Sequence, residues 1–279
     1  MDSLVSTSWL ASELGSADLR IVDATYFLGG SGRDPRADYE AAHIPGAMFL
    51  DLPELADKDS PLPNMRPPAH KFASRMQSLG IGDGSRVVTY DNSPLRTAAR
   101  AWWLLRSFGA QRVAILDGGF AKWQAEGRPV ESGRPQVRHG HFTPLSDQQA
   151  VADKAFMLAN LEQRPHQILD ARSAERFAGG GPDAHGVAGG HIPGSANLPY
   201  GRLFNADGTY KKGEALRAEF DAAGVDLDRP LVTTCGSGVT ACVLLFGAHL
   251  LGREGVKLYD GSWSEWGADP NTPKAIQSP

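Results

Sequence analysis

Cys235 is the residue of this chain best placed for nucleophilic chemistry. It ends the apolar, strand-like run Leu231-Val-Thr-Thr-Cys235, and a glycine-rich turn and a helix-compatible segment starting near Val239 follow it. Because Gly236 and Gly238 can adopt backbone conformations that other residues resist, the turn can direct successive N–H groups at the sulfur. Cysteines at helix N-termini have pKa values lowered from about 8.5 to roughly 3.5–7.5, so we expect a thiolate at neutral pH.

A cysteine that follows a strand can also be a small buried apolar residue with no chemical role. Two glycines and two hydroxyl groups in the next five residues favour the reactive role. The predicted substrate-binding loop therefore comprises Gly236, Ser237, Gly238, Val239 and Thr240.

The second cysteine, Cys242, is predicted to be a buried apolar residue on the helix after this loop. It lies seven positions after Cys235 on one turn-plus-helix unit, so no disulfide is expected between them. Neither a Cys-x-x-Cys motif nor a Cys/His cluster is present, and no metal or organic cofactor is expected.

Length and composition indicate an ordinary globular protein with two domains. The chain has 279 residues, 41% hydrophobic and 22% charged, with a net charge of −4. This charge gives no reason to expect nucleic acid or a membrane as partner. The start Met1-Asp-Ser-Leu-Val lacks a basic segment and a sustained apolar core, so we expect a cytoplasmic protein.

Three segments occur twice in the same order, about 145 residues apart, which predicts a duplicated domain. The stretch between the copies is polar, rich in Pro and Gly, and is typical of a linker. We expect a non-catalytic domain over 1–130, a linker over 131–145 and a catalytic domain over 146–279. The repeated pairs are Ile21–Ala24 with Ile168–Ala171, His43–Ala47 with His191–Ser195, and Leu116–Trp123 with Tyr259–Trp266.

Short β-rich runs alternate with longer helix-compatible stretches in each copy, a pattern that predicts mainly parallel sheets flanked by helices. The active site of such an α/β fold lies beyond the carboxyl ends of the strands, where Cys235 stands. The expected strands are 21–23, 86–90 and 113–116, then 168–170, 231–234 and 257–259. The expected helices include 69–79, 97–108, 213–223 and 239–251.

The two copies differ at the nucleophile, since Asp91 occupies the place of Cys235 in the first copy. A carboxylate at the start of a helix is a favourable cap and has no nucleophilic role here. One active site per chain is therefore expected, with the first copy as a scaffold.

The repeated His-Ile-Pro-Gly, the Asp-Gly segments near Leu116 and Tyr259, and Cys235-Gly-Ser-Gly-Val-Thr-Ala241 resemble the rhodanese superfamily, over essentially the whole chain. The resemblance is to its two-domain thiosulfate and 3-mercaptopyruvate sulfurtransferases. It implies that the cysteine accepts a sulfane sulfur as a persulfide and passes it to a thiol or cyanide. Mercaptopyruvate enzymes resemble this loop, whereas thiosulfate enzymes carry Cys-Arg-Lys, whose two cations suit a dianionic donor.

Two arginines follow the repeated Asp170. Arg176 matches the family arginine that holds the anionic group of the donor, and a guanidinium can grip a carboxylate through two parallel hydrogen bonds. Arg172 is expected to form a structural ion pair instead.

The chain departs from the mercaptopyruvate pattern at two places. The second substrate arginine of that branch would fall at Ala184, in a stretch that is more similar to the thiosulfate branch. An Asp/His pair proposed to polarise the loop serine is replaced by Pro53 and Asn64. We therefore expect the Ser237 hydroxyl to donate a hydrogen bond to the carbonyl of the sulfur-donating substrate or to the sulfur. No Asp-His-Ser relay is expected.

Other residues that could suggest chemistry are assigned to structure. His43 and His191 both precede Ile-Pro-Gly, and a histidine present in the active and the inactive copy is best explained as fixing a turn through a nearby carboxylate. The tryptophans are expected to be core or interface anchors: Trp102, Trp103, Trp263 and Trp266.

The resemblance therefore implies a 3-mercaptopyruvate sulfurtransferase that releases pyruvate and delivers sulfur to cyanide, a small thiol or a thioredoxin-like protein. A thiosulfate sulfurtransferase and a persulfide carrier serving a protein partner are the alternatives. A phosphatase of the same fold is disfavoured, because such enzymes usually need a longer loop closed by an arginine.

Overall fold

The computed structural model describes residues 1–180 and 187–276. Their contacts divide the chain into two compact units. The first comprises Met1–Asp57, Arg66–Asp147 and Ala206–Thr209. The second takes Lys58–Met65 and the described residues of Gln148–Asn205 and Tyr210–Pro279, so one short segment of the first repeat belongs to the second unit.

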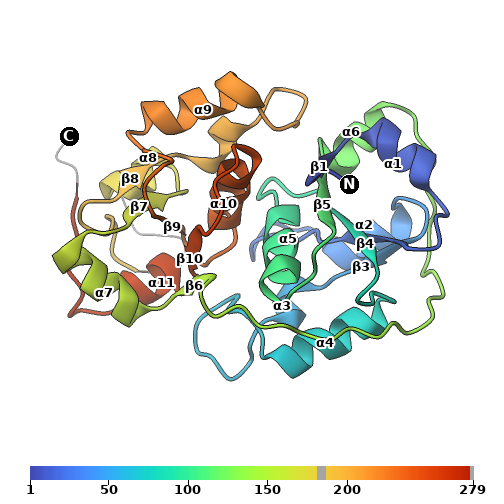
Figure 1. The fold of residues 1–279 in the computed structure, drawn as a ribbon, viewed down its shortest axis with the longest axis horizontal. Coiled ribbons are helices and arrows are strands. Elements are labelled where there is room, and N and C mark those ends of the chain that lie inside the picture. The colour runs from blue at the N-terminus through green and yellow to red at the C-terminus, as the bar shows by residue number, and fades with distance from the viewer. Residues whose placement is uncertain (181–186, 277–279) are drawn as a thin grey trace. The chain divides into compact units, whose positions relative to one another are not determined.

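The first unit is built on a five-stranded parallel sheet with the order β1-β5-β4-β2-β3 (Figure 1). Its strands β4 and β5 are buried at all positions except Arg86, as expected where helices cover both faces. Its elements are β1 (Leu4–Val5), α1 (Thr7–Glu13), β2 (Leu19–Asp23), α2 (Pro35–Ala41), β3 (Ala47–Phe49), α3 (Leu52–Leu55), α4 (Ala69–Ser78), β4 (Arg86–Tyr90), α5 (Ala98–Ser107), β5 (Val113–Leu116) and α6 (Gly119–Ala125).

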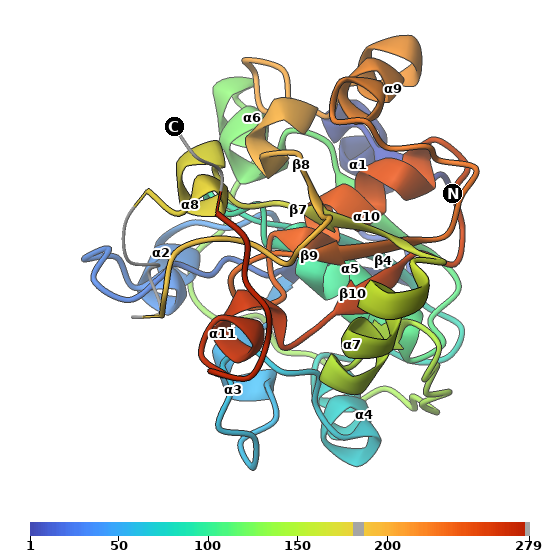
Figure 2. The ribbon, with the colours of Figure 1, turned by 90° about the vertical axis from the view of Figure 1, so that its left-hand side faces the viewer.

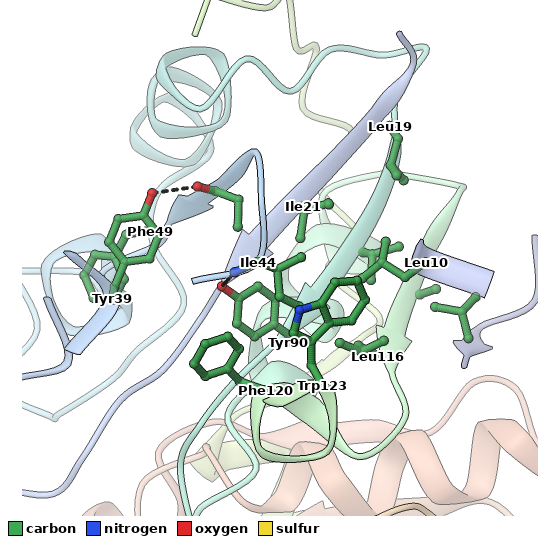
Figure 3. Packing of buried hydrophobic residues seen from close by; sticks show 14 residues of the cluster. Leu10, Leu19, Ile21, Tyr39, Ile44, Phe49, Tyr90, Leu116, Phe120 and Trp123 are labelled. Carbon is green, nitrogen blue, oxygen red and sulfur yellow. Dashed lines mark hydrogen bonds between the residues drawn. The ribbon is translucent and has the colours of Figure 1, made fainter. Parts of the chain in front are cut away.

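Aromatic side chains fill much of the core of this unit, as Figure 3 shows. Trp123 and Tyr90 are fully buried beside aliphatic residues of β2 and β5. The hydroxyl of Tyr39 donates to the carbonyl of Ala47 at 2.6 Å, and the hydroxyl of Tyr90 accepts from the Ile44 N–H at 3.3 Å. The polar ends of these rings are thus satisfied, which buried tyrosines require.

Asp23, at the end of β2, is predicted to make the stability of the chain pH-dependent. Burial raises its pKa to about 6, although bonds from Thr25 oppose the rise. The folded protein therefore binds a proton near pH 6 that the unfolded chain binds near pH 4. The contribution of Asp23 to stability is therefore fully present below about pH 4 and is lost, by roughly 1.4 kcal/mol per pH unit, until about pH 6.

An Asp23→Asn variant has no titratable group at this position. The melting temperature of the variant minus that of the unmodified protein should therefore increase as the pH rises from 4 to 7. Thermal unfolding followed by circular dichroism across that range measures the difference. A difference in melting temperature that stays constant with pH would contradict the assignment to Asp23.

The second unit repeats the architecture with a five-stranded parallel sheet of order β6-β10-β9-β7-β8. Strand β9 occupies its centre. The elements are β6 (Val151–Ala152), α7 (Lys154–Gln163), β7 (Gln167–Asp170), α8 (Ala174–Ala178), β8 (Ala196–Asn197), the 3₁₀ turn η1 (Tyr200–Leu203), α9 (Gly213–Ala222), β9 (Leu231–Thr234), α10 (Ala241–Leu250), β10 (Lys257–Tyr259) and α11 (Ser262–Trp266).

Helices cover both faces of this second sheet. Figures 1 and 2 agree in placing α9 and α10 on one side of β9 and β10, and α7 and α11 on the other. Helix α10 is buried along most of its length, as its apolar sequence requires. Met157 of α7 packs with Trp263 and Trp266 of α11 in the core on the opposite face. Helix α10, which begins after the loop that follows Cys235, is thus packed against the sheet of the second unit.

The predicted fold class is confirmed: two units, each a parallel sheet flanked by helices. All six predicted strands and four predicted helices form, with ends within two residues of those expected. The edge strands β1, β3, β6 and β8 were not predicted, because two or three residues are too few to show a period. The domain boundaries at 130 and 146 stay a prediction.

Candidate active site

Cys235 lies at the carboxyl end of the central strand β9, directly after Thr234. Its parallel neighbours are β7 and β10, so the ends of three strands surround it. The Trp263 N–H donates to the Cys235 carbonyl at 3.0 Å, and the Ser264 N–H donates to the Gly236 carbonyl at 2.8 Å. The residue is only 1% exposed, and both cysteines are thiols. The first turn of α11 therefore fixes the backbone on which the thiol stands.

The hydroxyl of Ser262 holds the loop in its curled form. Its oxygen accepts from the N–H of Cys235 at 3.2 Å and from the N–H of Gly238 at 3.1 Å, while its proton goes to the Tyr259 carbonyl at 2.7 Å. Gly238 has a φ of 76°, which glycine adopts readily. The N–H of Gly238, one of the loop amides expected to face the sulfur, thus binds Ser262 Oγ instead. Among the described residues no loop N–H donates to Cys235 Sγ, so the predicted ring of amides around the sulfur is not formed there.

The remaining N–H groups of the loop are not used within the part of the chain that the structure describes. Gly236, Ser237, Val239 and Thr240 have no acceptor there for their N–H groups. Amides in the first turn of a helix commonly lack an intrahelical partner. Here they follow a buried thiol, and all but Thr240 belong to buried residues. They are hydrogen-bond donors without an acceptor among the described residues.

The matching loop of the first unit shows what such amides bind. Phe120 N–H donates to the Asp91 carbonyl at 3.0 Å, as Trp263 does to Cys235, which confirms that Asp91 stands in the place of the cysteine. The Asp91 carboxylate accepts from the N–H groups of Ser93 and Ala98, both at 2.8 Å. Burial raises the pKa of this carboxyl, and the two amide bonds oppose the rise. The carboxylate thus caps α5, as the sequence predicted.

Ser262 is a site residue that the sequence reasoning did not single out. Its φ is 51°, a left-handed conformation that is unfavourable for a residue with a side chain. The matching residue of the first repeat is Gly119, with a φ of 59°. A strained backbone conformation that persists beside a reactive group points to a functional constraint. Comparing the two repeats at this position was the signal that could have found it.

Arg172 forms the structural ion pair that the sequence predicted. Its guanidinium donates to both carboxylate oxygens of Asp170, with a closest distance of 2.7 Å, and to the Gly190 carbonyl at 2.7 Å. It also lies 4.5 Å from the ring centroid of Trp263, and its side chain is 0% exposed. This arginine therefore supports the end of β7 and is not available to a donor.

Arg176 lies in α8, the short helix after β7, and is partly buried. The Ala171 N–H donates to the Thr234 carbonyl at 2.9 Å, so the chain leaving β7 runs beside the residue that precedes Cys235. Ser173 caps the helix by accepting from the Arg176 N–H. Arg176, the arginine predicted to hold the anionic group of the sulfur donor, thus lies at the same edge of the sheet as the Cys235 thiol. Ala184, the other position compared with the family, lies outside the described residues.

Ser237 is 5% exposed and its Oγ accepts a hydrogen bond from Asn64 Nδ2 at 3.1 Å. Val239 is 5% exposed, and Thr240 is the N-cap residue of α10. The structure therefore brings all the predicted loop residues together around one helix start, and it adds Asn64 from the first repeat.

His43 and Cys242 have the structural roles that were expected, whereas His191 bonds a backbone carbonyl in place of the expected carboxylate. His43 bonds the Tyr39 carbonyl at 2.7 Å and the Glu131 carboxylate at 3.2 Å. His191 bonds the Phe177 carbonyl at 2.8 Å and stacks on its ring. Cys242 is 0% exposed and its thiol donates to the Gly238 carbonyl at 3.4 Å. All four tryptophans named above are buried.

Other features of the described residues do not compete with this site. A cavity of about 270 Å³ opens beside Gln167 and Arg229 at the amino ends of the strands, the edge opposite to Cys235. Over 1–180 and 187–276, no group of three or more His, Cys, Asp or Glu side chains is arranged to hold a metal. In the same ranges, no helix has the length and apolar character needed to cross a bilayer.

The chain is similar to known proteins over nearly its whole length. The family model of the rhodanese-like domain matches it twice, at residues 6–126 and 154–269. The 3-mercaptopyruvate sulfurtransferase of Rattus norvegicus is 41% identical over 271 residues, covering 95% of this chain and 91% of that protein. The thiosulfate sulfurtransferase of Bos taurus is 40% identical over 272 residues, with coverages of 95% and 91%. The crystal structure of SseA from Escherichia coli, described as a 3-mercaptopyruvate sulfotransferase, has a TM-score of 0.87 at 38% identity, covering 95% of this chain and 100% of that one.

Proposed function

Since the chain belongs to the rhodanese-like family of sulfurtransferases, we propose that it transfers the sulfur of 3-mercaptopyruvate through a persulfide on Cys235 to an acceptor, and releases pyruvate. The observation that carries the proposal is the loop after Cys235, which has unused N–H donors and no cationic side chain. Relatives named for mercaptopyruvate and for thiosulfate are similar to this chain at 41% and 40% identity, so the loop residues decide between the donors.

The reaction begins when the Cys235 thiolate attacks the sulfur of the donor. An S–S bond forms, the C–S bond of the donor breaks, and its electron pair enters the enolate of pyruvate, which then takes a proton. Hydrogen bonds aimed at the developing enolate oxygen lower the barrier for such a step. The Ser237 hydroxyl and the unused loop amides are the groups that supply them.

Charge supports mercaptopyruvate as the donor. Thiosulfate is a dianion, and a loop of Gly236, Ser237, Gly238 and Val239 offers it no positive side chain. Mercaptopyruvate carries one carboxylate, which a single guanidinium can hold through two parallel hydrogen bonds. We assign this role to Arg176, at the same sheet edge.

Steady-state kinetics with both donors, and with cyanide or a small thiol as acceptor, test the proposal. We expect kcat/KM for mercaptopyruvate to exceed that for thiosulfate by at least about 10-fold, the value of one hydrogen bond to a charged group. A preference for thiosulfate would overturn the choice of donor. Mass spectrometry that finds sulfur on Cys235, together with slow turnover by every small acceptor, would indicate a persulfide carrier.

The Arg176→Lys variant tests whether Arg176 holds the carboxylate of mercaptopyruvate. Lysine keeps the charge but cannot form two parallel bonds, so we expect KM for mercaptopyruvate to rise about 10-fold while kcat changes less. The matched control is Arg229→Lys, which makes the same change at an exposed position at the other sheet edge. An unchanged KM in Arg176→Lys would remove this residue from the donor site.

The acceptor and the cellular location are also proposals. We infer a thiol acceptor, either a small thiol or a thioredoxin-like protein, with cyanide as a substitute, and a location in the cytoplasm. Turnover measured with each acceptor in parallel, and fractionation of cells followed by immunoblotting, test these two points.

A further inference from the structure

Asn64 contacts the predicted catalytic loop although it is distant from it in sequence. It belongs to the segment Lys58–Met65, which lies within the first family match but folds with the second unit. Its side-chain Nδ2 donates to Ser237 Oγ at 3.1 Å, across 173 positions of the sequence. The loop that follows Cys235 therefore depends on one side chain from the other repeat.

The backbone of Asn64 is held in an uncommon conformation. Its φ is 60°, in the left-handed region that Asn tolerates better than most residues. Such conformations persist when the surrounding structure requires them, and they concentrate at functional sites. The segment before it is shaped locally by the bond from the Leu62 N–H to Ser60 Oγ at 3.2 Å. The strained backbone presents the amide to the loop serine.

The direction of the hydrogen bond determines what Ser237 can do. The amide nitrogen is only a donor, so the serine oxygen accepts and its own proton must point away from Asn64. Because Ser237 is 5% exposed, bulk water is not its main alternative partner. The hydroxyl proton is thus left for a group bound in the loop.

We propose that Asn64 is a positioning residue that orients the Ser237 hydroxyl toward the oxygen on which the pyruvate enolate develops. The inference rests on the function proposed above. Since this oxygen gains charge only in the transition state, losing the orientation lowers kcat and kcat/KM together and leaves KM nearly unchanged. An amide performs this role as a neutral donor and does not transfer a proton.

A double-mutant cycle between Asn64 and Ser237 tests the proposal. With mercaptopyruvate and a small thiol, Asn64→Ala should lower kcat about 10-fold and change KM less than about threefold, as expected for one hydrogen bond. In a Ser237→Ala background the same change should alter kcat less than about twofold, because the group that it orients is gone. The control Asn271→Ala removes the same side chain at an exposed position and should retain normal kcat.

Asn64→Asp provides a second test that does not change the size of the side chain. A carboxylate can only accept, so it would turn the Ser237 proton away from the substrate, and kcat should fall further than in Asn64→Ala. This variant decides the question if Asn64→Ala does not fold, as judged by thermal unfolding.

The outcomes separate this inference from the proposed function. Two results would overturn the positioning role in a protein that loads sulfur on Cys235 and turns over normally. One is an unchanged kcat in Asn64→Ala. The other is an equal loss of kcat on Asn64→Ala in the unmodified protein and in the Ser237→Ala background. If the unmodified protein does not load sulfur from mercaptopyruvate, the proposed function is overturned first, and the positioning role with it.

Discussion

Replacing Cys235 with serine is expected to lower kcat for sulfur transfer by at least about 10,000-fold, as removal of other enzyme nucleophiles does. A hydroxyl in this place stays protonated near neutral pH and cannot form a persulfide, so both the attack and the sulfur carrier are lost. Steady-state turnover and mass spectrometry after incubation with donor measure the two losses. Because a hydroxyl differs little in size from a thiol, we expect the fold to be retained.

Cys242→Ser is the matched control for this prediction. Cys242 is the other buried thiol, on the same helix unit and without contact with substrate in the proposed mechanism. Its variant should still load one sulfur atom and turn over. Sulfur transfer that survives in Cys235→Ser and disappears in Cys242→Ser would reverse the assignment of the nucleophile.

Substitution of Ser262 is expected to produce the second largest loss, about 100-fold in kcat. Without its hydroxyl the N–H groups of Cys235 and Gly238 lose their shared acceptor, and the loop is free to leave its curled form. An unpaired buried N–H costs about 1–3 kcal/mol, so the two together cost about 2–6 kcal/mol, a range that includes the about 2.7 kcal/mol of a 100-fold change in rate. Kinetics with mercaptopyruvate, together with thermal unfolding, measure activity and stability separately.

The choice of replacement distinguishes strain from hydrogen bonding. Ser262→Gly removes the unfavourable left-handed conformation, worth about 1–2 kcal/mol, together with the hydroxyl, and reproduces the residue of the first repeat at Gly119. Ser262→Ala keeps the strain and loses only the hydroxyl. Both should lose activity, but the alanine variant should melt at the lower temperature. A glycine variant with normal kcat would show that the hydroxyl does not organise the loop.

Much of the fold was predictable, because the information is local in the sequence. The apolar run 231–234 and the turn residues after Cys235 predict a central strand followed by a helix, and the repeated segments predict the duplication. The pairing of Arg172 with Asp170 was predictable for the same reason, since the two residues are neighbours on one strand end. The short edge strands carry no such local pattern.

The details of the site depend on contacts between distant segments, which a single sequence does not encode. Ser262 lies 27 positions from Cys235 and binds the N–H of Gly238, one of the amides that were expected to face the sulfur. Asn64 lies even farther from the loop in sequence. It stands where the resemblance implies a histidine, and this difference suggested only that the relay to the serine was absent. The roles of Arg176 and of the loop residues in binding the donor stay predictions until the kinetic tests are made.

The Asp91 carboxylate has a consequence for the evolution and redesign of the first copy. In that loop the Asp91 side chain already accepts from two backbone N–H groups, so these two donors are not left for a bound ligand. Turning it into a second reaction centre would require more than exchanging the aspartate for cysteine, because the glycines at 236 and 238 are replaced there by bulkier residues, with Pro94 among them. The loop of the first copy thus binds a carboxyl group of its own chain, whereas four N–H groups of the matching loop in the second copy have no acceptor among the described residues.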